Sequence, residues 1–329
     1  MFFSIVIPTY NPRSFLPTLL SSICNNECIN DIEVIVSDDC STEQFDDVLT
    51  EYKQLNIVKI SNKKHSGFPR NGRQHGLEQV SGEWICFADQ DDCFVDGIFD
   101  RTKQLIEEQG LQNTIAYNVI LKDKELSIEE ERHGNMRATH GKFFEKSFLT
   151  KYNISYDRVQ KCEDLNFCTK ILCTLYENDL EPYIIEEPAY IWQIRSTSLC
   201  NDEYRLDMSY DFAKAVIGVS YRYLSKYRHD KKLFPQYCYI FFEDFLSLFF
   251  YIQCAEMHGK TKTIEKAIKY IKPLFSEFKI ILQYTNSDII KLVNTIYLER
   301  YNEIRNNIFY QIFFIEQMTF NDYLNVYFN

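Results

Sequence analysis

The sequence lacks an excess of positive charge. Its 329 residues include 36 Lys and Arg against 47 Asp and Glu, which gives a formal net charge of -11. Binding to nucleic acid phosphates requires a basic surface, and so does loose attachment to anionic lipid. The composition therefore argues against nucleic acid as a partner and allows at most a peripheral association with membranes.

Cysteine pairs and a leader-like start are also missing. The eleven cysteines are an odd number and form no Cys-x-x-Cys pair, so neither a disulfide framework nor a zinc site is indicated. The opening "MFFSIVIPTYN" has no basic stretch before its short apolar run, which predicts no signal peptide. We expect reduced cysteines and a cytoplasmic location, with the inner face of the cell membrane as the alternative.

A long uninterrupted apolar run is absent as well. Residues 233–257 are long enough to span a bilayer, but Glu243 and Asp244 lie at their centre. Charged side chains there cost several kcal/mol on insertion into a membrane. A buried helix of a globular domain is the better interpretation, and 45% hydrophobic residues suffice for a packed core.

Strand and helix patterns alternate through the first part of the chain. Alternation at this spacing predicts an α/β fold in which parallel strands bind ligands at their carboxyl ends. A helix over 97–109 and a strand over 114–121 follow, then a charged loop over 122–137, two helical pieces over 141–157 and 163–179, and paired strands over 183–195 broken at Pro188. The earlier strands are expected near 3–8, 32–37, 56–61 and 84–88, and the helices near 15–24, 41–52 and 72–80.

Helical periodicity with few glycines dominates the rest of the chain. We place a domain boundary near residue 203, which separates an α/β domain (1–203) from an all-helical C-terminal domain (204–329). Aromatic residues recur there at helical spacing, and core packing or a homodimer interface explains them better than a ligand site. These residues include Phe241, Phe242, Phe245, Phe249 and Phe250.

Polar residues follow the first two predicted strands. Pro8 and Tyr10 end the first strand, where a planar base could stack, although turn chemistry explains a proline equally well. Asp38 and Asp39 end the second strand. One aspartate suffices to cap the next helix, which leaves the other to accept a hydrogen bond from a base edge.

Three carboxylates end the fourth strand, in the stretch "WICFADQDDC". Asp89 and Asp91 form an Asp-x-Asp pair of the kind that holds Mg²⁺ or Mn²⁺ together with substrate phosphates. An acidic turn that caps the next helix is an equally good interpretation of this motif alone. Asp92 is expected to serve as that cap.

Taken in order, four segments resemble one family. "FSIVIPTYN", "VIVSDDCS", "GLEQVSGEWICFADQDD" and "KCEDLNF" are similar to the family 2 glycosyltransferases with the GT-A fold, over roughly the first 200 residues. The resemblance implies a Rossmann-like mixed sheet that binds a nucleotide sugar, and metal-dependent transfer with inversion. It implies that Pro8 and Tyr10 border the nucleobase and Asp39 binds its edge. Asp89 would face the ribose or a metal-bound water, and Asp91 would bind the metal directly.

The family pattern also includes an arginine that contacts the diphosphate. Counting back from Glu83 selects Arg73, whereas the literal Arg-Asn pair here begins at Arg70. The position on the predicted helix favours Arg73, and a surface role remains an alternative for either residue. The segment "YIWQIRSTS" resembles the family's strand and loop that close over the donor, which implies donor contacts for Arg195 and Ser198.

The remaining part of such a site is a general base. Glu163 and Asp164 begin a helical run, a placement that the helix dipole alone explains. The resemblance implies that Asp164 removes the proton of the acceptor hydroxyl and that Glu163 supports it.

The sequence thus predicts an inverting glycosyltransferase that uses Mn²⁺ or Mg²⁺, a nucleotide-diphosphate donor with UDP-sugars favoured, and a glycan or bacterial surface or wall polysaccharide as acceptor. Two alternatives stay open: a metal-dependent nucleotidyltransferase, which lacks its usual Gly-rich loop here, and a non-catalytic binding or assembly subunit of the same fold.

Overall fold

The computed structural model describes residues 1–123, 128–132, 136–159, 161–194, 209–257, 259 and 261–283. The chain divides into two compact units, residues 1–198 and 199–329. The boundary predicted at residue 203 lies outside the described residues.

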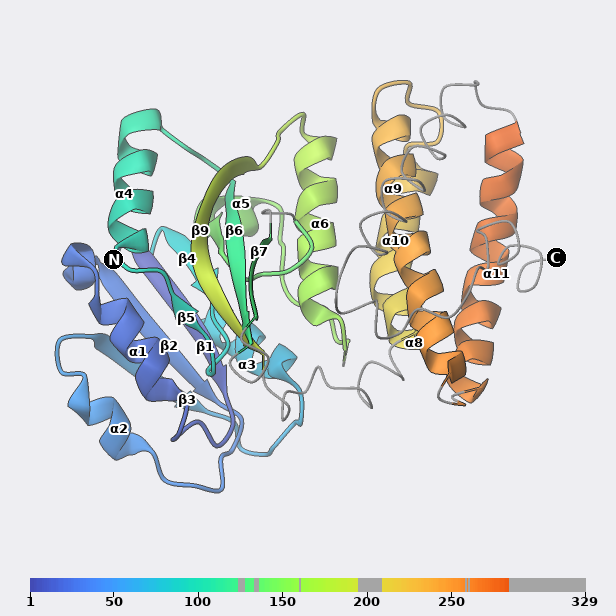
Figure 1. The fold of residues 1–329 in the computed structure, drawn as a ribbon. Helices are drawn as coiled ribbons and strands as arrows, with labels where there is room; N and C mark the ends of the chain where they lie inside the picture. Colours follow the sequence, from blue (N-terminus) through green and yellow to red (C-terminus); the bar gives the residue numbers. More distant parts are fainter. Residues whose placement is uncertain are drawn as a thin grey trace. The chain divides into compact units, whose positions relative to one another are not determined.

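In the N-terminal unit the described strands form one nine-stranded mixed sheet with the order β3-β2-β1-β4-β8-β6-β9-β5, and β7 pairs with β6 (Figure 1). The strands are β1 (Phe3–Thr9), β2 (Ile32–Asp38), β3 (Asn56–Ser61), β4 (Trp84–Phe87), β5 (Cys93–Phe94), β6 (Thr114–Asp123), β7 (Ile128–Arg132), β8 (Lys142–Glu145) and β9 (Tyr183–Ile194).

Helices cover both faces of this sheet (Figure 1). Side chains alternate between the two faces of a strand, so Phe3 and Ile5 of β1 join one hydrophobic cluster while Val6 joins another. The first cluster includes residues of α1, α2 and α4, and the second includes residues of α5 and α6. The described helices are α1 (Leu16–Cys24), η1 (Glu27–Asp31), α2 (Asp46–Glu51), α3 (Pro69–Leu77), α4 (Ile98–Gln109), α5 (Lys146–Lys151) and α6 (Glu163–Glu177).

The parallel half of the sheet agrees with the predicted alternation. Strand β1 pairs in parallel with β2 and with β4, and β2 pairs in parallel with β3. The residues that follow β1, β2 and β4 therefore emerge at the same edge of the sheet.

Three predictions for the second half were wrong. The helical piece expected over 141–157 begins with β8, which pairs antiparallel with β4 and β6. The charged segment over 122–137 contributes β7, which forms a ladder with β6. The paired strands over 183–195 are one strand, β9, that absorbs Pro188 through a register shift opposite Asn118. In each case pairing with β6 or β4 overrides the local sequence pattern. Such pairing is a tertiary effect, which local propensity does not predict.

The C-terminal unit is helical in its described part. It contains α8 (Ser209–Phe212), a π-helical turn (Ala213–Ile217), α9 (Gly218–Lys226), α10 (Leu233–Met257) and α11 (Thr261–Gln283). Phe241 and Phe245 of α10 are buried and stack on each other, so core packing accounts for these two aromatics. None of the helices in the described part of the chain combines the length and hydropathy that crossing a bilayer requires.

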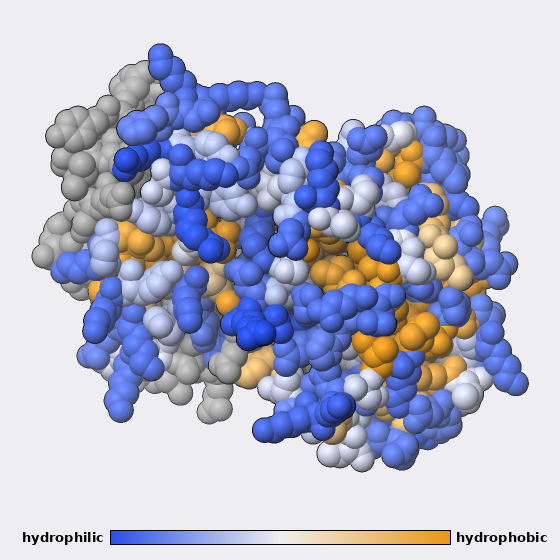
Figure 2. Space-filling model, turned by 180° about the vertical axis from the view of Figure 1, so that it is seen from behind, coloured by the Kyte–Doolittle hydropathy of each residue, from blue (hydrophilic) through white to orange (hydrophobic). Residues whose placement is uncertain are grey.

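Hydrophilic residues cover most of the face drawn in Figure 2, and hydrophobic residues reach the surface in patches. One exposed apolar side chain is Val58 of the edge strand β3. Single exposed apolar residues of this kind are ordinary in globular domains.

A close backbone approach fixes the entry into β4. A Cβ atom added at Gly82 would lie 2.7 Å from the carbonyl carbon of Phe3 and 2.8 Å from the amide nitrogen of Ser4. Both of these atoms belong to the backbone of the central strand β1, so neither can move aside easily.

We therefore expect Gly82→Ala to lower the free energy of unfolding by about 1–3 kcal/mol, as overpacking does in a closely packed core. Urea denaturation measures the change. The matched control is Gly110→Asn: Gly110 has a φ of +64° and nothing within 4 Å, and asparagine tolerates that conformation. Equal losses in the two variants would contradict the role assigned to the contact with β1.

Candidate functional site

The candidate site lies at the carboxyl ends of β1, β2 and β4. Pro8 and Thr9 close β1 in register with Ser37 and Asp38 of β2. The backbone N–H of Asp39 donates a hydrogen bond to the carbonyl oxygen of Thr9 at 2.8 Å, which ties the two strand ends together. The edge predicted from the strand pattern is therefore formed.

Asp39 is buried and accepts hydrogen bonds from the loop between β3 and α3. Its carboxylate receives the Nδ2 of Asn62 at 2.7 Å, the amide and hydroxyl of Ser66 at 2.9 Å each, and the amide of Gly67 at 3.1 Å. Hydrogen bonds from these four donors satisfy the buried carboxylate and fix its orientation. Asp39 thus organises a loop of its own chain at the place where base recognition is predicted.

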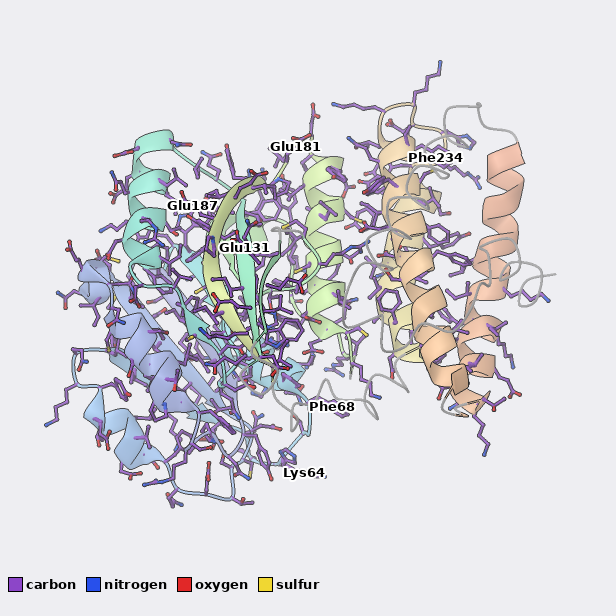
Figure 3. The ribbon with its side chains drawn as sticks, viewed as in Figure 1. Lys64, Phe68, Glu131, Glu181, Glu187 and Phe234 are labelled. Atoms are coloured by element: carbon purple, nitrogen blue, oxygen red, sulfur yellow. The ribbon has the colours of Figure 1, made fainter. Side chains whose placement is uncertain are left out.

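The same loop places an aromatic ring on Tyr10. The imidazole of His65 stacks on the Tyr10 ring with centroids 4.0 Å apart and 27° between the planes, and its Nδ1 lies 3.0 Å from Oδ2 of Asp39. Lys64, which precedes His65, is labelled in Figure 3. Tyr10 is 37% exposed, and its backbone exchanges two hydrogen bonds with the side chain of Gln90. The loop between β3 and α3 therefore occupies both predicted base contacts, Tyr10 and Asp39.

A buried arginine joins the acidic turn to the second carboxylate pair. Arg73 of α3 is 3% exposed and forms ion pairs with Asp89, at 2.6 Å, and with Glu163 at the start of α6. These residues come from three elements that are far apart in the sequence. The structure brings Arg73, Asp89 and Glu163 together, with the guanidinium bound to carboxylates of its own chain.

The two carboxylates that Arg73 binds, those of Asp89 and Glu163, have pKa values that are shifted in opposite directions. Burial opposes ionisation of Asp89, but the charge of Arg73 and the hydrogen bond from His140 outweigh it and hold the pKa of Asp89 well below its usual range. Burial raises the pKa of Glu163 to about 7. The charge of Arg73 lowers this pKa, but the negative charge of the neighbouring Asp164 raises it, so the effect of burial is not fully offset. Glu163 therefore exchanges its proton near neutral pH.

Asp92 does not cap the next helix. It is buried, and its carboxylate accepts hydrogen bonds from the hydroxyl of Tyr190 at 2.8 Å and the amide of Gln193 at 2.9 Å. The expected cap is wrong because β9 reaches across the turn and takes both oxygens. Burial, and then the charge of Asp89, raises the pKa of Asp92 well above its usual value.

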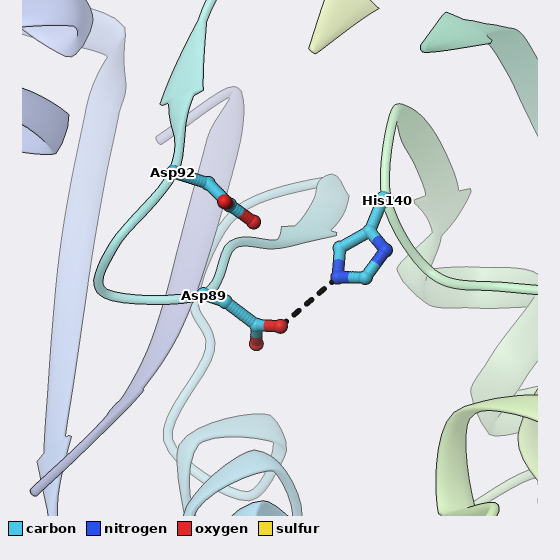
Figure 4. Close-up of side chains that lie close together, drawn as sticks. All are labelled: Asp89, Asp92 and His140. Atoms are coloured by element: carbon cyan, nitrogen blue, oxygen red, sulfur yellow. Dashed lines mark hydrogen bonds and ion pairs between the residues drawn. The ribbon is translucent and has the colours of Figure 1, made fainter. Parts of the chain in front are cut away.

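His140 faces this acidic turn from the segment before β8 (Figure 4). Its Nε2 lies 3.0 Å from Oδ2 of Asp89, and ligand atoms of His140, Asp89 and Asp92 all lie within 4.8 Å of one another. Carboxylate and imidazole groups at this separation fit a divalent cation. The predicted metal pair, Asp89 and Asp91, shares only Asp89 with this group, and Asp91 is partly exposed on the same turn.

The second candidate arginine also binds its own chain. Arg70 donates hydrogen bonds to the carbonyl oxygens of Tyr156 and Asp157, at 2.9 and 2.8 Å, and to Oδ1 of Asn71. It thereby fixes the segment that leads into α6. Contact of Arg70 or Arg73 with a diphosphate remains a prediction, and Arg195 and Ser198 lie outside the described residues.

The start of α6 separates the two carboxylates that follow Cys162. Cys162 has a left-handed backbone with a φ of 59°, and Glu163 and Asp164 form the first helical turn. Glu163 points into the protein toward Arg73, whereas Asp164 is partly exposed. Buried Lys142 lies close enough to Asp164 to interact with its charge, and burial lowers the pKa of Lys142 to about 8.

Some residues of the site carried no usable signal in the sequence. His65 and His140 have no second histidine at a metal-ligand spacing, so the local pattern indicates only surface or packing roles for them. Tyr190 and Gln90 have ordinary positions in their segments. Tyr190 enters the site through its hydrogen bond to Asp92, and Gln90 through its hydrogen bonds with the end of β1, and no local pattern reports either contact.

The high pKa of Glu163 makes a prediction for stability. Between the usual carboxyl pKa and about 7, Glu163 holds its proton in the folded protein and loses it in the unfolded chain. Its contribution to stability is therefore complete at low pH and is lost as the pH rises through 7. Relative to Glu163→Gln, the wild type should lose on the order of 2–3 kcal/mol of unfolding free energy between pH 4.5 and 7.5.

Urea denaturation across this pH range measures the difference between the two proteins. The control is Glu181→Gln, which removes an exposed carboxylate and should leave the wild-type slope unchanged. Parallel pH curves for wild type and Glu163→Gln would contradict the assignment.

Comparisons with known proteins identify one family and one fold. Residues 4–163 match the family described as Glycosyl transferase family 2. The chain is 36% identical over 94 residues to poly(ribitol-phosphate) beta-N-acetylglucosaminyltransferase TarS of Staphylococcus aureus, which is 28% of this chain and 16% of TarS. It is 24% identical over 360 residues to the minor teichoic acid biosynthesis protein GgaB of Bacillus subtilis, covering 98% of this chain and 37% of GgaB. The chain thus spans well under half the length of both relatives.

Solved structures establish the fold. TarS 1-349 of S. aureus in complex with UDP-GlcNAc superimposes with a TM-score of 0.61 at 17% identity, over 95% of this chain and 90% of that one. The mannosyltransferase PcManGT of Pyrobaculum calidifontis, in complex with GDP-Man and Mn²⁺, gives a TM-score of 0.52 at 13% identity, over 94% and 82%. The mixed sheet and the ordered strand ends identify a GT-A fold, and residues 4–163 of this chain belong to glycosyl transferase family 2.

Proposed function

We propose that this chain is a metal-dependent inverting glycosyltransferase that moves a sugar from a nucleotide-diphosphate donor to a hydroxyl group of a glycan or cell-wall polymer. The observation that carries the proposal is the buried ion pair network in which Arg73 joins Asp89, at the end of β4, to Glu163, beside the candidate base. It holds the donor end and the acceptor end of one site in a fixed relation. Family membership supports the reaction class.

A UDP-sugar is the favoured donor. TarS 1-349, which shares the fold, has been crystallised with UDP-GlcNAc. In the present chain Asp39 accepts N–H and O–H donors, and a uracil offers an imide N–H of the same kind. Tyr10 is partly exposed, and its ring can stack on a base once His65 has left it.

A divalent cation is the implied cofactor, and the residues present fit one. Asp89 provides a carboxylate whose ionised form is stabilised, Asp91 lies two residues along the same turn, and the group of ligand atoms around Asp89 is compact. When bound, the cation neutralises charge on the leaving diphosphate. The structure of PcManGT is a complex with GDP-Man and Mn²⁺, which supports Mn²⁺ as a candidate, with Mg²⁺ as the alternative.

Asp164 is the proposed base. An inverting transfer needs a carboxylate that accepts the acceptor's proton as its oxygen attacks the anomeric carbon. Glu163 is buried and bound to Arg73, so it is poorly placed to meet an acceptor. Asp164 is more exposed, and the amide of Leu165 orients it at 2.8 Å. Glu163 and Arg73 then act as positioning residues for the start of α6.

The acceptor class comes from the relatives. TarS is named for transfer to poly(ribitol-phosphate), and GgaB for teichoic acid biosynthesis, so a hydroxylated wall or surface polymer is the acceptor that we propose. We place the reaction at the cytoplasmic face of the membrane and give the helical C-terminal unit a role in acceptor binding or dimerisation.

The base and metal assignments predict separable effects. Asp164→Asn should keep binding of UDP-sugar, measured by calorimetry with Mn²⁺, and lose at least 10²-fold in donor hydrolysis or transfer. Asp91→Asn should lose the Mn²⁺-dependent part of donor binding. The control Asp96→Asn changes an exposed carboxylate beyond the turn and should leave both measurements unchanged. Failure of UDP-, GDP-, CMP- and dTDP-sugars to bind under every metal condition would overturn the proposal.

The loop between β3 and α3 makes a further prediction. If Tyr10 and Asp39 bind the base, the ring of His65 must leave the face of Tyr10 first, and removing it should favour binding. We expect His65→Ala to bind UDP about 3- to 10-fold more tightly, which corresponds to one stacking contact of about 0.5–1.5 kcal/mol. His75→Ala, an exposed histidine on α3, is the matched control. Weaker binding by His65→Ala would mean instead that His65 holds the base.

A further inference from the structure

Three side chains converge on one point beside the acidic turn. Asp89 and Asp92 flank the turn between β4 and β5, and His140 reaches it from the segment that precedes β8 (Figure 4). Their ligand atoms all lie within 4.8 Å of one another. The Asp-x-Asp pattern contains only one of these residues as a metal ligand, so the arrangement goes beyond what that motif implies.

We propose that His140 is a direct ligand of the catalytic cation, through Nε2, together with Asp89 and Asp92. The inference rests on the proposed function in one respect, which is that the bound cation acts on the diphosphate of the donor. The site itself is built from residues of this chain, and an imidazole ligand shifts its preference from Mg²⁺, which takes oxygen ligands, toward a transition-metal ion such as Mn²⁺.

The separation of His140 and Asp89 suits two ligands of one ion. Ligands about 2.1 Å from a metal at adjacent corners of an octahedron lie about 3.0 Å apart. Nε2 of His140 and Oδ2 of Asp89 are 3.0 Å apart. The other oxygen, Oδ1, is bound by Arg73 at 2.6 Å, so Asp89 presents a single oxygen on the side that faces His140.

Each ligand is held in its orientation by an outer partner. The His140 ring stacks on Tyr190 and on Trp192, with centroids 5.3 and 5.8 Å apart and planes 20° and 25° apart. The hydroxyl of Tyr190 and the amide of Gln193 orient the carboxylate of Asp92. Strand β9 therefore positions both His140 and Asp92, which is the role that outer partners play at metal sites.

The charge of the cluster also suits a cation. Asp89 and Asp92 place two carboxylates beside each other, and Asp92 is only 1% exposed. Arg73 pairs with Asp89 and Glu163 and is not bonded to Asp92. A divalent ion between the two carboxylates and the imidazole would give Asp92 the cationic partner that Arg73 gives Asp89.

Pulsed electron paramagnetic resonance of bound Mn²⁺ tests the proposal without relying on activity. The wild-type protein with Mn²⁺, with and without UDP, should show ¹⁴N coupling from a coordinated imidazole. His140→Gln should lose this coupling and bind Mn²⁺ at least about tenfold more weakly, while Mg²⁺ binding measured by calorimetry changes less. His75→Ala, the exposed-histidine control, should keep both the coupling and the affinity.

Asp92→Asn is a second variant that guards against a folding defect in His140→Gln. It replaces a carboxylate ligand by a neutral amide and leaves the imidazole, so Mn²⁺ should bind more weakly but retain ¹⁴N coupling at saturation. Mn²⁺ that binds the wild type without ¹⁴N coupling, or with equal affinity in His140→Gln, overturns the inference. Coupling without any nucleotide binding would support the metal site and count against the proposed function, so the two fail separately.

Discussion

The ion pairs of Arg73 hold the candidate site together. This side chain is nearly fully buried, and it binds one carboxylate at the end of β4 and another at the start of α6. Removing a charge from water costs free energy unless charged or hydrogen-bonding partners compensate for the lost hydration. Deleting one member of a buried ion pair therefore strongly destabilises the protein. Asp89 and Glu163 are therefore required to stay where they are, and with them the acidic turn and the first turn of α6.

The ion pairs of Arg73 also make the carboxylates of the site differ from one another in charge and exposure. Arg73 keeps Asp89 ionised and available to a cation, while burial leaves Glu163 a much weaker acid. Asp164 follows Glu163 but is partly exposed, which is the placement that a proton acceptor needs. Burial, and not residue type, thus gives two adjacent carboxylates different tasks.

The base end of the site is organised differently. There the loop between β3 and α3 folds over the strand ends, and Asp39 binds its amides while Tyr10 stacks on His65. The contacts that would receive a base are satisfied from within the chain. Binding of the proposed donor at this end would exchange one set of partners for another, which costs less than exposing a buried carboxylate and an aromatic ring to water.

The sequence by itself determined the parallel half of the sheet and the residues at its edge. Hydrophobic runs that end in Pro8, Asp39 or Asp89 mark both a strand and the place where it ends. Both faces of these strands are buried, so most strand residues are apolar and polar residues cluster where the strand ends. It also determined the helix that begins at Glu163. These are local patterns, and they placed Asp39, Asp89 and Asp164 correctly at strand and helix ends.

Only the tertiary structure decided the rest. Strand β8, the hairpin of β6 and β7, and the single long β9 form because partner strands satisfy their backbone hydrogen bonds, and a partner is not visible in a local pattern. For the same reason the sequence did not predict that His140 faces Asp89, that Tyr190 and Gln193 bind Asp92, or that His65 covers Tyr10. Each of these contacts joins residues at least 50 positions apart, and packing alone brings them together.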